Sequence, residues 1–300
     1  MSKLLELQFT IICLVSLGVI LRRKKLIGDA GRKNITDLVI NVILPCNIVM
    51  SFVNGQGRYD LRSCAVVLVI SIAVQLFCVA YGKLAYRTGE ESERQCLRYG
   101  IICSNAGFLG NPIAEGMYGA DGLMLASIYL IPLRIMMWSE GIRMFSRTES
   151  GRSWKRVALH PCVLACGIGF VLMILPIHLP AVVTTPLKTI GQCNTTLSML
   201  IIGMILAEIK VRDLADRRVI RFALERLVLI PAIVYFGCGL LRIDSMVTGL
   251  CVILAAMPAG ATTSMLAAKY DSNPAFATKL VVTSTLLSIP SILLWGVALS

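Results

Sequence analysis

The sequence predicts an all-helical integral membrane protein in which ten transmembrane helices form two inverted repeats of five helices each. Three observations lead to this fold class: an apolar composition, ten apolar segments of spanning length, and an internal repeat. Hydrophobic residues make up 56% of the 300 residues and charged residues only 15%, with a mean hydropathy of +0.77. This composition lies far outside the usual balance of a soluble domain, so most of the chain is expected to face lipid.

Ten apolar segments follow one another, each close to the roughly 20 residues that a membrane-spanning helix needs. The first lacks a basic leader and a small-residue cleavage site and is followed by further spans, so it is expected to be a retained helix and not a signal peptide. In chain order, segments one to ten cover residues 4–21, 35–53, 63–82, 96–117, 122–145, 158–176, 183–208, 219–241, 247–268 and 276–298.

Lys and Arg are concentrated in the connections that follow odd-numbered segments. The connections after even-numbered segments hold only Arg58, Arg62 and Arg242. The positive-inside rule then places the odd connections in the cytoplasm and both termini on the non-cytoplasmic side of the cell membrane. The net charge of +12 follows this topological pattern, so no nucleic-acid partner is expected.

An internal repeat is visible when the two halves of the chain are overlaid. The run NAGFLGNPIAEGMYG from Asn105 aligns with PAGATTSMLAAKYDS from Pro258, and IPLRIMMW from Ile131 aligns with IPSILLW from Ile289. Because five is an odd number of spans, the second copy must enter the membrane in the opposite sense, as in the inverted repeats of secondary transporters. Residues 1–150 are therefore expected to be the first repeat and residues 151–300 the second.

The centre of segment four is expected to be broken. Its Gly, Asn and Pro residues are denser than an uninterrupted lipid-facing helix favours. Asn111 is expected to be the N-cap, and Pro112 the first residue, of a second half-helix that starts near the bilayer midplane. The predicted site residues of this break are Asn105, Gly107, Gly110, Asn111 and Pro112.

Segment nine is expected to have a matching break at Pro258 and Gly260, with the hydroxyls of Thr262, Thr263 and Ser264 as caps. Two half-helix N-termini would then meet, and their unpaired backbone N–H groups and positive dipole ends favour an anion. One interruption alone would indicate an ordinary proline kink. Two at matching places in inverted halves predict a substrate site.

Arg134 is the most informative charge, because it lies near the centre of segment five, where a charged side chain costs about 2.5–3.5 kcal/mol on insertion scales. It either contacts a carboxylate of the substrate or pairs with an acid such as Glu115 or Glu140, and the sequence does not separate these roles. Glu115 is also a candidate partner for a coupling proton or sodium ion.

Other polar groups carry weaker indications. Asn194 in segment seven either joins helices or lines the cavity wall. Glu208, Glu225 and Arg226 are expected only to frame the cytoplasmic interface. No metal and no cofactor is expected, because neither of the two histidines belongs to a metal-binding motif and the cysteines in the apolar segments show no CxxC spacing.

Four stretches carry a resemblance to a known family: NAGFLGNP, GQCNTTLSMLIIGMILAE, ERLVLIP and MPAGATTSMLAAKYDSNPAFATKLVVTSTLLSIP. At these residues the sequence resembles the auxin efflux carrier family in its compact bacterial form. The resemblance implies that segments four and nine cross at the substrate site, that segments one, two, six and seven form a scaffold, that the other six form a moving domain, and that the protein is a homodimer.

The resemblance also implies a substrate class. Bacterial members look like permeases for malate, malonate and related carboxylates, and plant members carry auxin, itself a carboxylate. This chain differs from the large plant carriers in having only a short basic connection between its halves. Arg134 stands where relatives are expected to have a neutral residue, often Asn, which marks it as a candidate second carboxylate contact.

The predicted function is secondary transport of a small organic anion across the lipid bilayer, by a crossover elevator-type alternating-access mechanism. No GxxxxGK[ST] motif for ATP is present. The alternatives are an intramembrane enzyme, for which no His lies near the breaks as a base, and a channel, for which a filter signature is missing. Binding without turnover and a saturable flux would separate transport from both.

Overall fold

The computed structural model describes residues 2–54, 61–138, 140–145, 159, 161–175, 179–207, 216–270 and 272–299. Within these ranges the chain is helical apart from turns, short non-helical stretches and one isolated β-bridge, and every predicted apolar segment contains helix. Five helical stretches of the described residues are long and apolar enough to cross a membrane: Asp29–Asn54, Leu61–Ala85, Ala106–Met137, Ala181–Leu206 and Pro274–Ala298.

Several sequence predictions fall outside the described residues. The boundary between the repeats at residues 150 and 151 is one of them, and so are Arg58, Glu208 and both histidines, His160 and His178. The number of ten spans and the inverted orientation of the repeats remain predictions.

Contacts along the chain divide it into two compact units. The first unit comprises Met1–Cys64, Asn111–Ile128 and Ala158–Ile209. It contains α1 (Ser2–Arg23), α2 (Asp29–Leu38), the π-helical turn η1 (Val39–Ile43), α3 (Leu44–Asn54), the first part of α6 (Asn111–Trp138), α9 (Pro161–Ile174) and α10 (Ala181–Leu206).

The second unit comprises Ala65–Gly110, Tyr129–Val157 and Lys210–Ser300. It contains most of α4 (Leu61–Ala85), α5 (Glu91–Ile102), η2 (Ala106–Gly110), the end of α6, α7 (Glu140–Phe145), α11 (Arg217–Leu224), η4 (Glu225–Leu229), α12 (Ile230–Leu240), α13 (Ser245–Ala255), α14 (Thr262–Lys269) and α15 (Pro274–Ala298).

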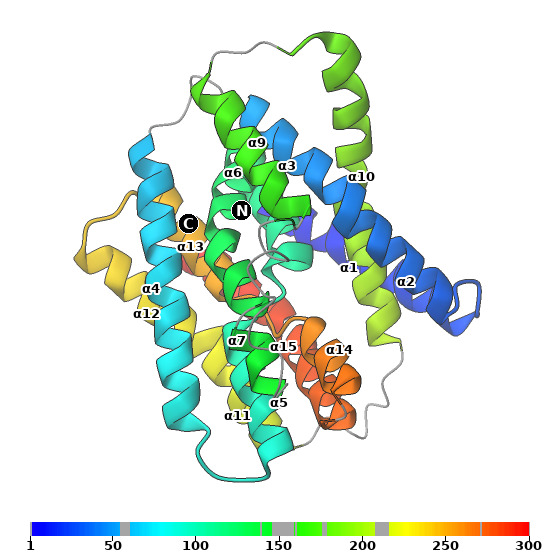
Figure 1. The fold of residues 1–300 in the computed structure, drawn as a ribbon, viewed down its shortest axis with the longest axis vertical. Helices are drawn as coiled ribbons and strands as arrows, with labels where there is room; N and C mark the ends of the chain where they lie inside the picture. The colour runs from blue at the N-terminus through cyan, green and yellow to red at the C-terminus, as the bar shows by residue number, and fades with distance from the viewer. Residues whose placement is uncertain are drawn as a thin grey trace. The chain divides into compact units, whose positions relative to one another are not determined.

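Small residues set the packing of the first unit, in which α10 lies along α1 and α3 (Figure 1). A Cβ added at Gly18 of α1 would lie 2.3 Å from the carbonyl oxygen of Leu200, and one added at Gly203 of α10 would lie 2.1 Å from that of Val15. The two helix backbones therefore touch. Such small-residue contacts are how helices associate where lipid provides no hydrophobic drive.

A proline follows each of the three π-helical turns found in the described residues. η1, η2 and η4 each end two residues before a proline, at Pro45, Pro112 and Pro231. Proline has no N–H group, and its ring clashes with the carbonyl group four residues earlier in a regular α-helix. In all three cases that carbonyl belongs to the π-helical turn, whose wider winding accommodates the ring.

One carbonyl group that lacks a helical donor because of Pro231 is hydrogen-bonded to side chains instead. It belongs to Leu227, four residues before the proline. Its oxygen accepts hydrogen bonds from Ser291 Oγ and Trp295 Nε1 of α15, each at 2.9 Å. This satisfies the group inside the second unit, where an unpaired carbonyl would be costly. Through this carbonyl group, η4 is hydrogen-bonded to α15.

Gly119 separates two helices that run together as α6. Its φ of 68° and ψ of −155° interrupt the helical conformation, and a positive φ is readily available only to glycine. The position agrees with the predicted connection between segments four and five, at residues 118–121. The first part of α6 therefore completes segment four, and the second part begins segment five.

Candidate substrate site

The second unit contains two helix breaks that face each other. α5 ends at Ile102 and helix resumes at Ala106, whereas α13 ends at Ala255 and helix resumes at Thr262. Between them, Ser104 and Ala259 form an isolated antiparallel β-bridge. Residues 155 positions apart in the chain are thus joined through their main chains.

Backbone hydrogen bonds hold this crossing together. The N–H of Asn105 donates to the carbonyl oxygen of Pro258 at 2.7 Å, and the N–H of Gly260 donates to that of Cys103 at 2.9 Å. The N–H of Ala259 donates to Ser284 Oγ at 3.2 Å. These three N–H groups are therefore occupied and are not available to an anion. The donors left for a ligand belong to the first turns of η2 and α14, although Leu109 N–H already donates to the carbonyl oxygen of Asn105 and Thr263 N–H to that of Gly260.

Two glycines of the predicted site permit the close approach at the crossing. A Cβ at Gly260 would lie 3.1 Å from the carbonyl oxygen of Cys103. A Cβ at Gly110 would lie 2.8 Å from Leu254 Cδ2 of α13. Both distances are shorter than an ordinary van der Waals contact, so a side chain at either position must displace a neighbour. A Cβ at Gly107 would meet open space, so Gly107 plays no part in this packing.

The first break is displaced from the predicted position. The prediction placed it at residues 105–112 with Asn111 as N-cap and Pro112 as the first helical residue, but the chain is non-helical at 103–105 and helical from Ala106 onward, so the two ranges share only Asn105. The π-helical turn η2 allows Pro112 to lie within the helix, which is why no new start is needed there. Asn111 therefore caps no helix.

The hydroxyl caps predicted for α14 are also absent. The residue before this helix is Ala261, and no side chain caps it. Thr262 Oγ1 and Thr263 Oγ1 are instead buried and have no hydrogen-bond partner among the described residues. The amide oxygen and nitrogen of Asn111, in the first unit, are likewise buried and have no partner in the described part of the chain. Buried polar groups normally have partners, so such atoms are candidates for contact with a bound molecule.

Arg134 is a buried cation that forms no ion pair with any of the described residues. Only 6% of its surface is exposed, and its Nη1 has no hydrogen-bond partner among the described residues. One of the two acids considered for it, Glu140, forms its ion pair with Arg143, at 3.3 Å. A buried, unpaired guanidinium is costly, whereas a carboxylate bound to it would form strong charge-assisted hydrogen bonds.

The first unit holds the other predicted polar residues. Glu115 Oε2 accepts a hydrogen bond from Asn47 Nδ2 of α3 at 3.2 Å. Asn194 of α10 is 1% exposed; its amide oxygen accepts from Ser198 Oγ at 3.4 Å, and its amide nitrogen has no partner among the described residues. Close to Asn47, Gly191 of α10 leaves no room for a Cβ. A buried amide donor thus remains for a ligand or an adjoining group.

Sequence reasoning missed the role of Arg226. It was expected to frame an interface, but only 1% of its surface is exposed, and its guanidinium donates to two backbone carbonyl groups next to the helix breaks. The motif ERLVLIP contains it, and the only signal in the sequence was that Arg226 directly precedes the apolar run LVLIP. Glu225, by contrast, bonds to the exposed Arg221 and to the hydroxyl of Tyr86.

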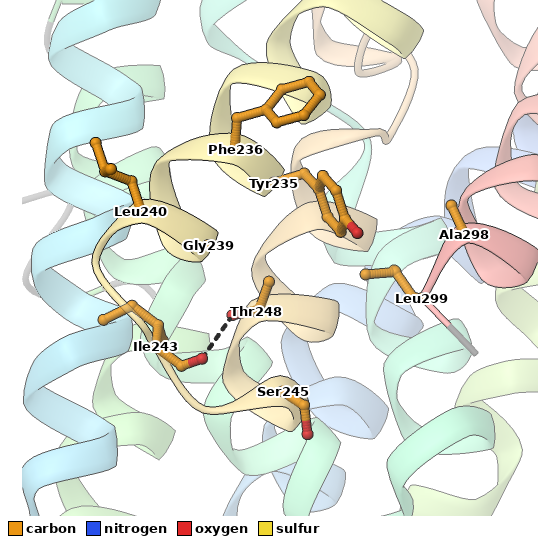
Figure 2. A pocket seen from close by; sticks show the side chains of 9 residues that line it. All are labelled: Tyr235, Phe236, Gly239, Leu240, Ile243, Ser245, Thr248, Ala298 and Leu299. Atoms are coloured by element: carbon orange, nitrogen blue, oxygen red, sulfur yellow. Dashed lines mark hydrogen bonds between the residues drawn. The ribbon is translucent and has the colours of Figure 1, made fainter.

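Two cavities lined by described residues do not include the predicted site residues. The larger, of about 500 Å³, lies between α12, α13 and the end of α15 (Figure 2). Its lining is mainly apolar, and Thr248 Oγ1 donates to the carbonyl oxygen of Ile243 at its wall, at 3.4 Å. The second, of about 430 Å³, lies in the first unit and is lined by Arg22, Arg23, Lys25, Gly28 and Ala207.

The described part of the chain contains no group of three or more His, Cys, Asp or Glu side chains that could hold a metal ion. All eleven cysteines are free thiols, and most of them are buried or half-buried. They pack as small apolar side chains.

Comparisons with known proteins extend over the entire chain. The sequence profile of a family described as membrane transport protein matches residues 4–153 and, a second time, residues 150–296. An uncharacterized transporter of Methanothermobacter thermautotrophicus is 27% identical over 304 aligned positions, which cover 98% of each chain. An uncharacterized transporter of Methanocaldococcus jannaschii is 20% identical over 305 aligned positions, which cover 97% of each chain.

Proposed function

Because the chain belongs to the membrane transport protein family, which is the auxin efflux carrier family, we propose that it is a secondary transporter for a small organic anion. The proposed substrate is a mono- or dicarboxylate, such as malate, malonate or an auxin-like acid. The protein is a multi-pass membrane protein with long apolar helices. Both termini are proposed to lie on the non-cytoplasmic side, and the protein is proposed to act as a homodimer.

An anionic substrate is proposed because the guanidinium of Arg134 is buried and its Nη1 has no hydrogen-bond partner among the described residues. Within the second unit, the N-terminal turns of η2 and α14 add backbone donors and positive dipole ends near a crossing of two broken helices. Buried hydroxyls at Thr262 and Thr263 add two further hydrogen-bond donors. A carboxylate is the chemical group that this set of donors complements.

The proposed mechanism moves the second unit against the first, so that the site opens to each side of the membrane in turn. The grouping of contacts supports this mechanism. The helices of predicted segments one, two, six and seven fall in the first unit, and most of the other six segments fall in the second. Residues 111–128 depart from the simple scheme, because they group with the first unit although they belong to segments four and five.

The test is a thermal-shift screen of the purified protein against mono- and dicarboxylates, followed by uptake into proteoliposomes. A transported carboxylate should raise the melting temperature, since a ligand stabilises the state that it binds, and its flux should saturate with concentration. Amide analogues of the same acids are the matched ligands and should not stabilise. Flux that rises linearly with concentration would indicate a channel, and conversion of the acid into a product would indicate an enzyme.

A further inference from the structure

Arg226 is the largest of the described side chains that are almost completely buried. It lies in η4 of the second unit. Its Nε donates to the carbonyl oxygen of Met257 at 3.0 Å, and its Nη1 donates to the carbonyl oxygen of Ile101 at 2.9 Å. The same Nη1 lies 3.8 Å from Sγ of Cys78. One guanidinium therefore bridges two chain segments that are far apart in the sequence.

Both carbonyl groups belong to helix C-termini at the breaks. Ile101 lies in the last turn of α5, and Met257 follows the end of α13 by two residues. The last carbonyl groups of a helix have no partner within it, and the negative end of the helix dipole is located there. Arg226 thus places a positive charge between the negative ends of the two half-helices that cross.

This charge has no carboxylate partner among the described residues. The neighbouring acid in the sequence, Glu225, is occupied by Arg221, whose Nε lies 2.7 Å from Glu225 Oε1, and by the hydroxyl of Tyr86. The guanidinium instead donates hydrogen bonds to backbone carbonyl groups. The carbonyl dipoles of α5 and α13 therefore stabilise Arg226, and Arg226 stabilises them.

In transporters with discontinuous helices, unwound carbonyl groups and half-helix C-terminal ends are the usual ligands of a coupling cation. We infer that Arg226 is a built-in cation that occupies this place in the second unit, so that anion transport needs no sodium ion at the crossing. The inference rests on the proposed transport function. It concerns the metal ion only, because Glu115, bound to Asn47 in the first unit, stays available for a proton.

The wild-type protein provides the first measurement. Its melting temperature should be the same, within about 1 °C, in sodium, potassium and N-methylglucamine chloride at equal ionic strength. Carboxylate uptake into proteoliposomes should change by less than about twofold when sodium replaces potassium outside. A sodium-specific rise in melting temperature, or uptake that requires sodium, overturns the inference.

Variants of Arg226 provide the second measurement. Arg226→Gln and Arg226→Ala should lose uptake by at least about tenfold, because the two helix ends lose their counter-charge. Arg226→Lys should keep part of it, and millimolar guanidinium should restore uptake by Arg226→Ala at least about fivefold. The matched control is Arg217→Gln, at an exposed arginine that begins the adjoining helix α11, which should behave like wild type. Full uptake by Arg226→Gln without an added cation overturns the inference.

The melting experiment separates this inference from the proposed function, because it needs no substrate. If wild type neither binds nor moves any carboxylate, the proposed function fails. The inference is then decided by the melting temperature of Arg226→Ala. Added guanidinium should raise it more than it raises the melting temperature of wild type. If the neutral variants do not fold, the wild-type salt series and Arg226→Lys decide it. A sodium-specific stabilisation of wild type contradicts the inference in either case.

Discussion

The backbone N–H of Gly260 donates to the carbonyl oxygen of Cys103 at 2.9 Å, so the two helix breaks of the second unit are joined by their main chains. A Cβ at residue 260 would lie 3.1 Å from that oxygen, which cannot give way without disturbing the crossing. Gly260→Ala should therefore lower the melting temperature by several degrees, corresponding to about 1–3 kcal/mol. Gly260→Leu should abolish uptake. The control is Gly237→Ala in α12, where a Cβ meets open space, and equal melting temperatures for the two alanine variants would contradict the prediction.

Asn111→Leu should separate ligand binding from stability. Its side chain is fully buried and neither amide atom has a partner among the described residues, so the amide contributes desolvation cost without hydrogen bonds. Leucine has a similar size, and the variant should keep its melting temperature to within about 1 kcal/mol of wild type or exceed it. If the amide binds substrate, the thermal shift produced by the carboxylate should disappear. A large loss of stability would show that the amide has a structural partner.

The lowered pKa of Asp216 leads us to expect that the stability of the protein falls at acidic pH. Partial burial raises the pKa of this carboxyl, but hydrogen bonds from the Arg218 guanidinium and backbone N–H outweigh burial and hold the pKa below its ordinary value. The folded-state pKa is lower than the unfolded one, so the ionised group stabilises the protein above the unfolded pKa of about 3.9, and this contribution is lost as the pH falls through the folded pKa. Between about pH 6 and about pH 3, the melting temperature of Asp216→Asn should fall less than that of wild type. Identical acid profiles would contradict it.

Cysteine-accessibility labelling tests the predicted topology. Arg152→Cys should be labelled from the cytoplasm only and Ser300→Cys from outside only, because Lys and Arg crowd the odd connections. The exposed native cysteines, Cys13 and Cys193, should first be replaced by serine to remove background. Labelling of Arg152→Cys from outside in intact cells would reverse the topology.

The helical segments and the second break were predictable because they depend on local chemistry. Pro258 lacks an N–H group and Gly260 permits a close backbone approach, and the chain is non-helical there. The first break was predicted at residues 105–112 and overlaps the observed one only at Asn105, because the start of the following helix was placed several residues too late. Gly, Asn and Pro at 107–112 suggested a new helix start, but a π-helical turn before Pro112 keeps the helix intact. The same pattern precedes Pro45 and Pro231, so the position of a proline alone does not predict a break.

The roles of several residues depend on tertiary contacts and could not be predicted from the sequence. Whether Arg226 faces an interface or the interior depends on the carbonyl groups of Ile101 and Met257, which are far away in the chain. Whether a buried amide or hydroxyl has a partner depends likewise on distant residues. Asn111 and Thr263 were identified from the sequence, but as caps and not as unpartnered side chains. Candidate positions could thus be predicted, whereas their roles required the structure.

Arg134 is the residue on which the substrate class depends, and a double-mutant cycle with Glu115 decides its role. If the two were a structural ion pair, either single change would leave a buried charge unpaired, and Glu115→Gln with Arg134→Gln would recover much of the lost stability, with a coupling of about 0.5–3 kcal/mol. The structure favours the other outcome, because Glu115 accepts a hydrogen bond from Asn47 while Arg134 Nη1 is buried without a partner among the described residues. Stability coupling should therefore stay below about 0.5 kcal/mol.

Arg134→Gln should instead weaken binding of the preferred anion about tenfold or more and reduce the penalty for an analogue that lacks one carboxylate. The exposed Arg217→Gln serves as the control for a general loss of positive charge. Strong coupling in melting temperature with unchanged ligand affinity would make Arg134 a structural residue and remove it from the site.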